Sequence, residues 1–481
     1  MAALSADPAT AVWVGNAARD GTGEPLEVLD PSSGRRLVEF PAAGPPDVDA
    51  AVEAAAAARM GEWAGWTPLD RGRLCSRVAA ALLDDVESLA DLVVRDAGLP
   101  VSMARRDVET AARYFEYYAG LADKLQGDTI PLGPGFIDYT VREPWGVCAA
   151  VLPFNVPMQM AARSLAPALI AGNVVVLKPA EQAPLAPLEM ARRCALAGAP
   201  PGVVNAVTGT GAAGQRLVGH RLIDHITFTG SLGTGRRIMA AAAARVVPVI
   251  LELGGKSPQL VFADADLDAA ASTIVSSALR TAGQACSAGT LILVEEAVAA
   301  PLMERLATLV AALRVGPAAG DPDVGPVITA QQRDRILAAI EAAGEEGAEV
   351  LAGGTPTTEA SGFFVTPTLL RAAGTAATAV REEIFGPVLT VLPFAGENGA
   401  VAIVNGSEYG LVAGIWTGDV SRAHRVAAAV SAGQVFVNNY GVGGGVELPF
   451  GGYRRSGFGR LKGVEGALQY TQVKNVCVAL R

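Results

Sequence analysis

The stretch VCAAVLPFNVPMQMAARSLAPALIAGNVVVLKPAEQ, residues 147–182, contains the pattern that decides the fold. It begins with a short apolar run (147–152), continues with a segment long enough for one helix (158–171) and returns to an apolar run, VVVL (174–177). Short apolar runs that alternate with single helices indicate βαβ units, whose strands are parallel and bind ligands at their carboxyl ends. We therefore predict an α/β fold built on a parallel sheet.

The same alternation continues on both sides of this stretch. Further β-rich runs are VVNAV (203–207), HITF (225–228) and VPVILEL (247–253), and the segments 185–197, 211–220 and 231–245 each fit one helix. Residues 46–60 and 71–124 have helical spacing, with a break near Gly98–Pro100. A second alternating region runs from about Gly254 to Gly445, with β-rich runs at 290–296 and 434–439. A chain of 481 residues exceeds the size of one core. We expect a first α/β domain over 1–124 and 143–253 and a second over 254–453.

Two further segments have an extended pattern without a neighbouring strand. LQGDTIPLGPGFIDYTVR (125–142) is turn-rich and then β-like, and QYTQVKNVCVALR (469–481) ends as an alternating strand. Isolated strands need an edge to pair with, and a partner subunit would supply one. We predict that 125–142 and 465–481 form a small β oligomerisation arm, and that the chain is a homodimer or homotetramer.

Composition excludes several classes of partner. The net charge is −10, and no Lys/Arg cluster stands out, so we expect neither nucleic acid nor an anionic membrane surface. The charge-free stretches 144–162 and 426–446 are interrupted by prolines or by glycines and asparagines, which argues against a membrane span. No signal peptide pattern is evident. Five scattered cysteines without a C-x-x-C motif favour a reducing cytoplasm, with no disulfide framework and no metal site.

Cys286 is the candidate nucleophile. It lies in TAGQACSAGT between Gly283 and Gly289, among small residues that let backbone and ligand approach closely. A lone cysteine is also commonly a small buried apolar residue. For the other cysteines, which fall in helical or strand patterns, we keep that structural interpretation.

Glu252 and Asn155 are candidates for acid–base and oxyanion chemistry. Glu252 ends an apolar strand before Gly254, where burial would raise its pKa toward that of a general base at neutral pH. A strand-end carboxylate that reaches solvent is the alternative. Asn155 follows another strand between Pro153 and Pro157, where its amide could donate to an oxyanion or simply cap a helix.

Three segments carry signals for a dinucleotide. GTGAAG (209–214) matches G-x-G-x-x-G, but no acidic residue about 20 positions later clearly ends a strand. FTGSLGTG (228–235) also joins a strand to a helix, whose first amides could bind a pyrophosphate. Lys178 and Glu181 end another strand and could bind the ribose hydroxyls, or could be a solvated surface pair.

Taken together, the chain resembles the aldehyde dehydrogenase superfamily over nearly its whole length. The motifs stand in the family's order: EPWGV (143–147), PFNVP (153–157), LKPAEQ (177–182), FTGS (228–231), LELGGKSP (251–258), GQACSAG (283–289), EEIFGPV (382–388) and PFGGYRRSG (449–457). The resemblance implies that the first domain is a Rossmann-type NAD-binding domain and the second a catalytic domain. It also implies oxidation of an aldehyde to its acid, with NAD as cofactor.

The resemblance assigns roles to individual residues. Cys286 attacks the aldehyde and carries a thioester, Asn155 holds the oxyanion, and Glu252 activates the water that hydrolyses the thioester. In the family the phosphate turn is the 230–235 segment, so the glycines at 209–214 belong to the wall of the adenine pocket. The cofactor-binding residues are expected to be Phe154, Lys178, Glu181, Gly211, Gly230, Ser231, Gly235, Gly254, Glu383 and Phe385.

The sequence departs from common family patterns around the substrate. Phe154 and Val156 flank Asn155 where many members have Trp and Phe, and Arg163–Ser164 stand at positions that are often Trp–Lys. Leu461–Lys462 follow GFGR, where many members place a Glu. The stretch 153–169 is similar to members that act on aromatic aldehydes, so we expect an aromatic or medium aliphatic aldehyde as substrate.

Three other functions have to be weighed against aldehyde oxidation. A CoA-acylating semialdehyde dehydrogenase would lack a water-activating glutamate, so Glu252 argues against it. A non-catalytic, NAD-binding member would have lost Cys286, Glu252 or Asn155, and all three are present. A thiol hydrolase needs a histidine base, and His220, His225 and His424 form no recognisable arrangement with Cys286.

Overall fold

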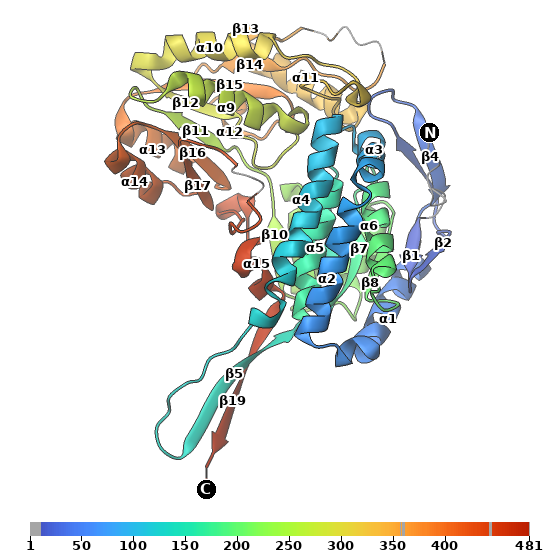
Figure 1. Ribbon diagram of the computed structural model, residues 1–481. Helices are drawn as coiled ribbons and strands as arrows, with labels where there is room; N and C mark the ends of the chain where they lie inside the picture. The colour runs from blue at the N-terminus through green and yellow to red at the C-terminus, as the bar shows by residue number, and fades with distance from the viewer. Residues whose placement is uncertain (1–10, 356, 358–360, 442–444, 481) are drawn as a thin grey trace.

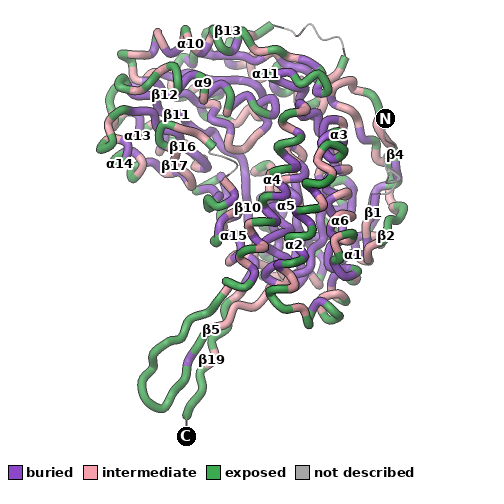
Figure 2. The backbone as a smooth tube through the Cα atoms, in the orientation of Figure 1, coloured by how far each residue is buried: buried purple, intermediate pink, exposed green. Residues whose placement is uncertain are grey.

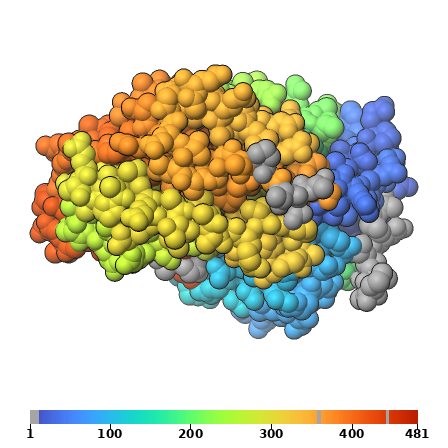
Figure 3. All heavy atoms as spheres, turned by 90° about the horizontal axis from the view of Figure 1, so that it is seen from above, coloured from blue at the N-terminus to red at the C-terminus, as the bar shows by residue number. Residues whose placement is uncertain are grey.

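The computed structural model describes residues 11–355, 357, 361–441 and 445–480. Two sheets with their helices make up the body, and a two-stranded arm projects away from both, with the C-terminus at its tip (Figure 1). Seen from above, the yellow-to-orange part of the chain, which contains α10 and α11, forms much of one face (Figure 3). The predicted α/β fold, with parallel strands in two separate sheets, is confirmed.

The first sheet has eight strands in the order β18-β10-β9-β6-β7-β8-β1-β2. Its parallel strands are β6 (Val147–Val151), β7 (Val174–Lys178), β8 (Val204–Val207), β9 (His225–Thr229) and β10 (Val249–Glu252). Its connecting helices are α5 (Pro157–Ala171), α6 (Leu185–Leu196), α7 (Gly211–Gly219) and α8 (Leu232–Ala243). The chain runs outward from β6 to β8 and then returns to β9 on the other side of β6. This reversal makes a crevice at the carboxyl ends of β6 and β9.

The helical segment before this sheet consists of four helices. They are α1 (Pro45–Met60), α2 (Pro68–Leu83), α3 (Val86–Ala97) and α4 (Val101–Ala119), and α2 and α4 pack against α5. The predicted break near Gly98–Pro100 is present, because Gly98 adopts a left-handed conformation with φ +69°. A second break at Asp84–Asp85, which the sequence pattern did not indicate, separates α2 from α3.

Edge strands complete the first sheet. Antiparallel strands β1 (Val12–Val14) and β2 (Ala17–Arg19) extend it beyond β8, and β18 (Gly457–Phe458) pairs with β10. The β1–β2 hairpin was assigned to no element in the sequence analysis, because its strands are too short to show a period. Separately, β3 (Pro25–Leu29) and β4 (Arg36–Pro41) form a two-stranded ribbon.

The second sheet has seven strands in the order β13-β14-β15-β12-β11-β16-β17. They are β11 (Pro258–Val261), β12 (Leu291–Glu295), β13 (Glu349–Ala352), β14 (Thr368–Arg371), β15 (Val388–Phe394), β16 (Val412–Trp416) and β17 (Gln434–Val437). Leu291 and Leu293 face one apolar cluster while Ile292 and Val294 face another. Both faces are therefore covered, as in other parallel sheets.

Helices cover both faces of the second sheet. They are α9 (Leu267–Leu279), α10 (Ala299–Ala311), α11 (Ala330–Glu345), α12 (Thr378–Arg381), α13 (Gly396–Gly406) and α14 (Val420–Ala429). A last helix, α15 (Gly463–Gln469), leads into the arm. Short 3₁₀ turns lie at Glu62–Gly65, Ala122–Lys124, Arg280–Gly283, Glu296–Val298, Ala318–Gly320 and Arg454–Ser456. Within the described ranges no helix is both long and apolar enough to cross a membrane.

The arm consists of β5 (Phe136–Pro144) and β19 (Thr471–Ala479). They pair antiparallel along their whole length, from Thr471 opposite Pro144 to Ala479 opposite Phe136. The expectation that a partner subunit must supply the edge for these segments is therefore wrong, because each segment supplies it to the other. The arm is largely exposed, as Figure 2 shows, and it carries the exposed apolar side chains of Phe136, Ile137, Val473 and Val478.

Candidate functional site

A hydrogen bond joins the Asn155 side chain to the loop that contains Cys286. Asn155 follows β6 in the crevice, and its Nδ2 donates to the carbonyl oxygen of Gln284, 2.8 Å away. The loop is a tight turn, since Thr281 and Ala282 have φ of 55° and 53°. A Cβ on Gly283 would come within 2.1 Å of the Gly386 carbonyl oxygen, so only glycine fits there.

The Cys286 thiol differs from the other cysteines in its access. It is partly exposed, whereas Cys75, Cys148 and Cys194 are fully buried. Burial raises the pKa of Cys286 to about 11, and the charges of Arg163 and Lys462 act in the opposite direction. No histidine is among the strongest influences on this pKa. The surroundings that favour a thiolate are therefore cations rather than an imidazole base.

Glu252 ends β10 beside the same loop. Its side chain is 1% exposed, and neither carboxylate oxygen has a hydrogen-bond partner among the described residues. Burial raises the pKa of Glu252 to about 8, while Arg163, Arg460 and Lys462 lower it. A carboxyl group with this pKa takes and releases protons near neutral pH.

Two cations meet at one aromatic ring in this region. Arg163 projects from α5, and its Cζ lies 5.3 Å from the centre of the Phe450 ring. The Lys462 ammonium lies 4.9 Å from the same centre. Phe450 belongs to an apolar cluster against which Cys286 packs. The sequence analysis noted Arg163 and Lys462 only as departures from the family pattern and did not propose them as site residues.

On the opposite side of the Gly254–Gly255 turn, Glu383 is held by the backbone. Its Oε1 accepts from the Gly255 N–H at 3.2 Å, and a Cβ on Gly254 would lie 2.0 Å from its Oε2. Burial raises the pKa of Glu383 to about 7, and the Gly255 bond and Lys256 lower it. A side chain at 254 would displace this carboxylate from its place against the turn.

Phe385 and Phe154, like Glu383, are among the cofactor-binding residues expected from the family resemblance. Their rings contact edge to face, with centroids 5.9 Å apart. Phe385 has φ 55°, and Gln332 Nε2 donates to its carbonyl oxygen at 2.9 Å, which holds this strained residue. The structure thus brings Phe154, Gly254, Glu383 and Phe385 together.

The two glycine turns, 209–214 and 230–235, can be compared by the space around each glycine. A Cβ on Gly235 would come within 2.6 Å of the Leu253 side chain, and one on Gly230 within 2.6 Å of the Phe228 ring, so a larger residue at either position would displace that side chain. Ser231 caps α8 by accepting from Thr234 N–H at 3.4 Å. By contrast, Gly211 opens α7 in open space. Gly233 in the other turn also faces open space, and a Cβ on Gly209 would come within 2.9 Å of Ala213. The turn after β9 lies beside Glu252, as Gly230 N–H donates to the Glu252 carbonyl oxygen at 3.0 Å.

Lys178 and Glu181 lie farther along the crevice, at the end of β7. Lys178 Nζ and Glu181 Oε2 are 3.0 Å apart, and the lysine is 4% exposed. A Cβ on Gly214 would be 3.9 Å from the Lys178 side chain, so α7 begins beside it. This pair is half-buried rather than a solvated surface pair, and it is separate from the cluster at Cys286.

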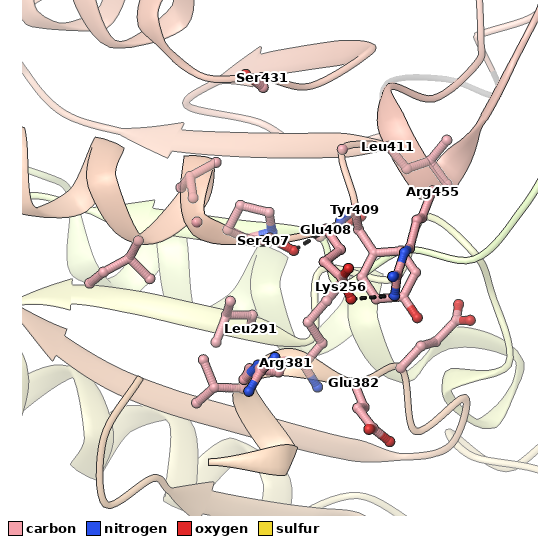
Figure 4. Close-up of a pocket in the computed structure, with 18 of the residues that line it drawn as sticks. Lys256, Leu291, Arg381, Glu382, Ser407, Glu408, Tyr409, Leu411, Ser431 and Arg455 are labelled. Carbon is pink, nitrogen blue, oxygen red and sulfur yellow. Dashed lines mark hydrogen bonds and ion pairs between the residues drawn. The ribbon is translucent and has the colours of Figure 1, made fainter. Parts of the chain in front are cut away.

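A cavity of about 660 Å³ lies on the second sheet (Figure 4), and Glu383 is one of the residues that line it. None of Cys286, Glu252 and Asn155 lines it. Lys256 points into it toward Arg381 and Glu382 (Figure 4). The buried Lys256 ammonium has no hydrogen-bond partner among the described residues, and burial lowers its pKa to about 8.

The comparisons with known proteins agree with this geometry. The model of the aldehyde dehydrogenase family matches residues 18–476. The chain is similar to a Burkholderia cenocepacia protein assigned to the aldehyde dehydrogenases, with 47% identity, TM-score 0.96, and 97% of this chain and 99% of that chain covered. It is also similar to the NAD⁺ complex of an aldehyde dehydrogenase from Bacillus cereus, with 37% identity, TM-score 0.96, and coverage of 98% and 97%.

A third solved structure is that of PnpE from Pseudomonas sp. WBC-3 in complex with nicotinamide adenine dinucleotide. It has 37% identity, TM-score 0.95, and 98% of each chain covered. The family match spans nearly the whole chain, and every segment that contributes to the site lies within it. The chain therefore belongs to the aldehyde dehydrogenase family.

Proposed function

We propose that this protein oxidises an aldehyde to its carboxylic acid with NAD, through a hemithioacetal and a thioester on Cys286 that water hydrolyses. The observation that carries the proposal is the arrangement at the end of β10. There a partly exposed thiol lies in the loop that the Asn155 amide holds, and the buried Glu252 carboxyl group, without a hydrogen-bond partner among the described residues, acts electrostatically on that thiol. These are the nucleophile, oxyanion donor and base that such a reaction needs.

In the first half of the reaction Cys286 attacks the aldehyde carbon as thiolate. Arg163 and Lys462 favour this ionised form, because both lower the pKa of the thiol. The Asn155 amide and the Cys286 backbone N–H donate to the oxyanion that forms. Asn155 has a second N–H for this purpose besides the one that donates to Gln284.

The residues of the crevice fit a dinucleotide. Lys178 and Glu181 bind the adenosine ribose, the turn with Gly230, Ser231 and Gly235 binds the pyrophosphate, and Gly211 belongs to the adenine pocket. Glu383, Phe385, Phe154 and Gly254 hold the nicotinamide riboside, and the glycine at 254 leaves space beside Glu383. Bound NAD supplies the hydride acceptor for the oxidation.

Glu181 favours NAD over NADP, because its carboxylate accepts ribose hydroxyls and repels a 2′-phosphate. Replacing Glu181 with Gln removes this charge but keeps the side-chain length. We expect the kcat/KM ratio of NAD to NADP to fall by about tenfold to a hundredfold in this variant. Equal values of kcat/KM for NAD and NADP in the unmodified protein would contradict the preference.

In the second half Glu252 takes a proton from water, which attacks the thioester and releases the acid. A thioester held beside this base is hydrolysed rather than transferred to a thiol cosubstrate, which argues against a CoA-acylating enzyme. The presence of Cys286, Glu252 and Asn155 in one cluster likewise argues against a non-catalytic, NAD-binding role. The substrate that we propose is an aromatic or medium aliphatic aldehyde.

We also propose the division of labour among the parts of the chain. Residues 1–124 and 143–253 form the NAD-binding domain and 254–453 the catalytic domain. The arm of 125–142 and 465–481 mediates a homodimer or homotetramer, since its exposed apolar side chains need cover. A cytoplasmic location is supported by the five cysteines, none of which forms a disulfide.

The test is direct detection of the thioester. The protein is mixed with NAD and an aldehyde panel of aliphatic, aromatic, amino- and semialdehydes, quenched in acid and digested for peptide mass spectrometry. We expect the peptide with Cys286 to gain the mass of the acyl group, in step with NADH formation. NADH formation without any adduct on Cys286 during single turnover would reject the mechanism.

A further inference from the structure

Arg163 and Lys462 are an unusual pair for this molecule because they lack a carboxylate partner. Neither has an Asp or Glu oxygen within 4.0 Å among the described residues, although each is in contact with the Phe450 ring. The one hydrogen bond of Arg163 in this part of the chain goes from Nη2 to the Thr229 hydroxyl, at 3.1 Å. Lys178 and Arg193, by comparison, are paired with Glu181 and Glu189.

A third polar group in the same region is also without a partner. The Tyr114 side chain is fully buried, and its hydroxyl has no hydrogen-bond partner among the described residues. Arg163 and Glu252 are the charged groups that most affect its pKa. Buried polar groups are nearly always paired in native proteins. The cluster of Arg163, Lys462 and Tyr114 therefore has unused capacity to bind a polar ligand.

The charges in the cluster do not balance. Glu252 is the carboxyl group with the largest effect on the pKa of Lys462, and both cations lower the pKa of Glu252. With a pKa of about 8, Glu252 is largely protonated at neutral pH. Glu447 also acts on Lys462, but it forms an ion pair with Arg113. Arg163 is buried and Lys462 is half-buried, and neither has an ion-pair partner among the described residues, so an anion would stabilise both.

The pair lies against the same apolar cluster as Cys286. Phe450 shares its apolar cluster with Leu411 and Val412, and Cys286 and Tyr440 pack against that cluster. Both cations also influence the Cys286 thiol electrostatically. A molecule whose carbonyl reaches Cys286 can therefore extend along Phe450, where Arg163 and Lys462 lie.

We infer that the aldehyde substrate carries a carboxylate at the end remote from its carbonyl, and that Lys462 together with Arg163 binds this carboxylate. The inference rests on the proposed function and narrows its substrate class to aldehyde acids. Lys462 is the specificity-determining residue of the two, because Arg163 already donates to Thr229 whereas Lys462 makes no hydrogen bond to a described residue. Its ammonium is free to meet the carboxylate as a charge-assisted hydrogen bond.

The competing explanation is that the two cations serve only to ionise Cys286. The two explanations predict different results for matched substrates. A carboxylate-binding pair changes the preference between a charged aldehyde and its neutral analogue. A pair that only activates the thiol changes the rates of both aldehydes by the same factor.

The experiment compares para-carboxybenzaldehyde with its methyl ester, and glutaric semialdehyde with pentanal, in the full-length protein with NAD. We expect kcat/KM to favour each acid by about tenfold to a hundredfold. Lys462→Met should lower the acid-to-neutral ratio at least about tenfold, whereas Lys462→Arg should largely keep it. Lys124→Met, the same change at an exposed lysine in the turn before the arm, should leave the ratio unaltered.

The outcomes separate this inference from the proposed function. Oxidation of neutral aldehydes with no preference for acids would overturn the inference alone, and so would an equal loss for both substrates in Lys462→Met. In that last case the pH profile of Cys286 alkylation by iodoacetamide should shift to higher pH in Lys462→Met. Absence of NADH formation with every aldehyde would overturn both proposals. Thermal unfolding of each variant confirms that it is folded.

Discussion

Glu252 precedes the Gly254–Gly255 pair and is buried, Glu383 lies half-buried against the same glycines, and the two carboxyl groups differ in what holds them. Burial raises both pKa values, to about 8 for Glu252 and about 7 for Glu383. Glu383 accepts from the Gly255 N–H, whereas both Glu252 oxygens lack a partner among the described residues. Burial alone therefore does not reveal a role. The presence or absence of a fixed donor separates a carboxylate that positions a ligand from one that is free to take a proton.

The comparison assumes that both carboxyl groups serve chemistry at Cys286, and removal of this thiol is the strongest test of it. We expect Cys286→Ser to lower kcat for aldehyde oxidation by at least about a thousandfold, because the hydroxyl is a far weaker nucleophile. NAD binding, followed by calorimetry, should remain. Cys477→Ser on the exposed arm is the matched control, and its turnover should equal that of the unmodified protein. Persistent turnover in Cys286→Ser would remove the basis for both roles.

Glu252→Gln tests the group with free oxygens. The amide keeps the shape but cannot take a proton from water, so we expect steady turnover to fall by about a hundredfold to a thousandfold. Formation of the thioester needs no water, so a burst of NADH equal to the enzyme concentration should remain in stopped-flow measurements. Loss of the burst would show that Glu252 acts earlier, for example in deprotonating the thiol.

Glu383→Gln should give the opposite pattern with a smaller effect. The amide can still accept from the Gly255 N–H but loses its charge, so we expect kcat/KM for NAD to fall by about tenfold to a hundredfold. The burst itself should become slower, because we propose that this residue holds the nicotinamide riboside during acylation. A fast, full burst followed by slow turnover, as in Glu252→Gln, would erase the distinction between the two carboxyl groups.

Much of this arrangement could be predicted from the sequence. The alternation of strands and helices placed Asn155, Lys178 and Glu252 at carboxyl ends of parallel strands, and such ends meet at one edge of a sheet. The motif GTGAAG could not be ranked against FTGSLGTG by pattern alone. Only the family resemblance ranks them, because each turn has one glycine in open space, Gly211 or Gly233, and at least one in close contact.

Pairings between distant segments could not be predicted. β5 pairs with β19 across more than 300 residues of chain, and local patterns contain no information about such a partner. Arg163 and Lys462 are likewise far apart in sequence, and both contact the Phe450 ring. Lys462 lies in the run LKGVEGA, which by itself does not indicate that its side chain contacts Phe450. Its position after GFGR does depart from the family pattern.

The smallest expected effect is the pH dependence that distinguishes the two carboxyl groups. Glu252 acts as a base only when ionised, and its pKa is raised to about 8, so hydrolysis of the thioester should accelerate as pH rises through 8. From one pH unit below that value to one above it, the ionised fraction rises about tenfold. The pKa of Lys462 is also about 8, so the observed midpoint belongs to the interacting pair. In Lys462→Met the loss of a cation should move this midpoint to higher pH, because that cation helps to hold Glu252 ionised. Glu252→Gln should show no such rise, whereas Glu383→Gln should keep it. A midpoint that disappears in Glu383→Gln but persists in Glu252→Gln would reverse the assignment of base and positioning group.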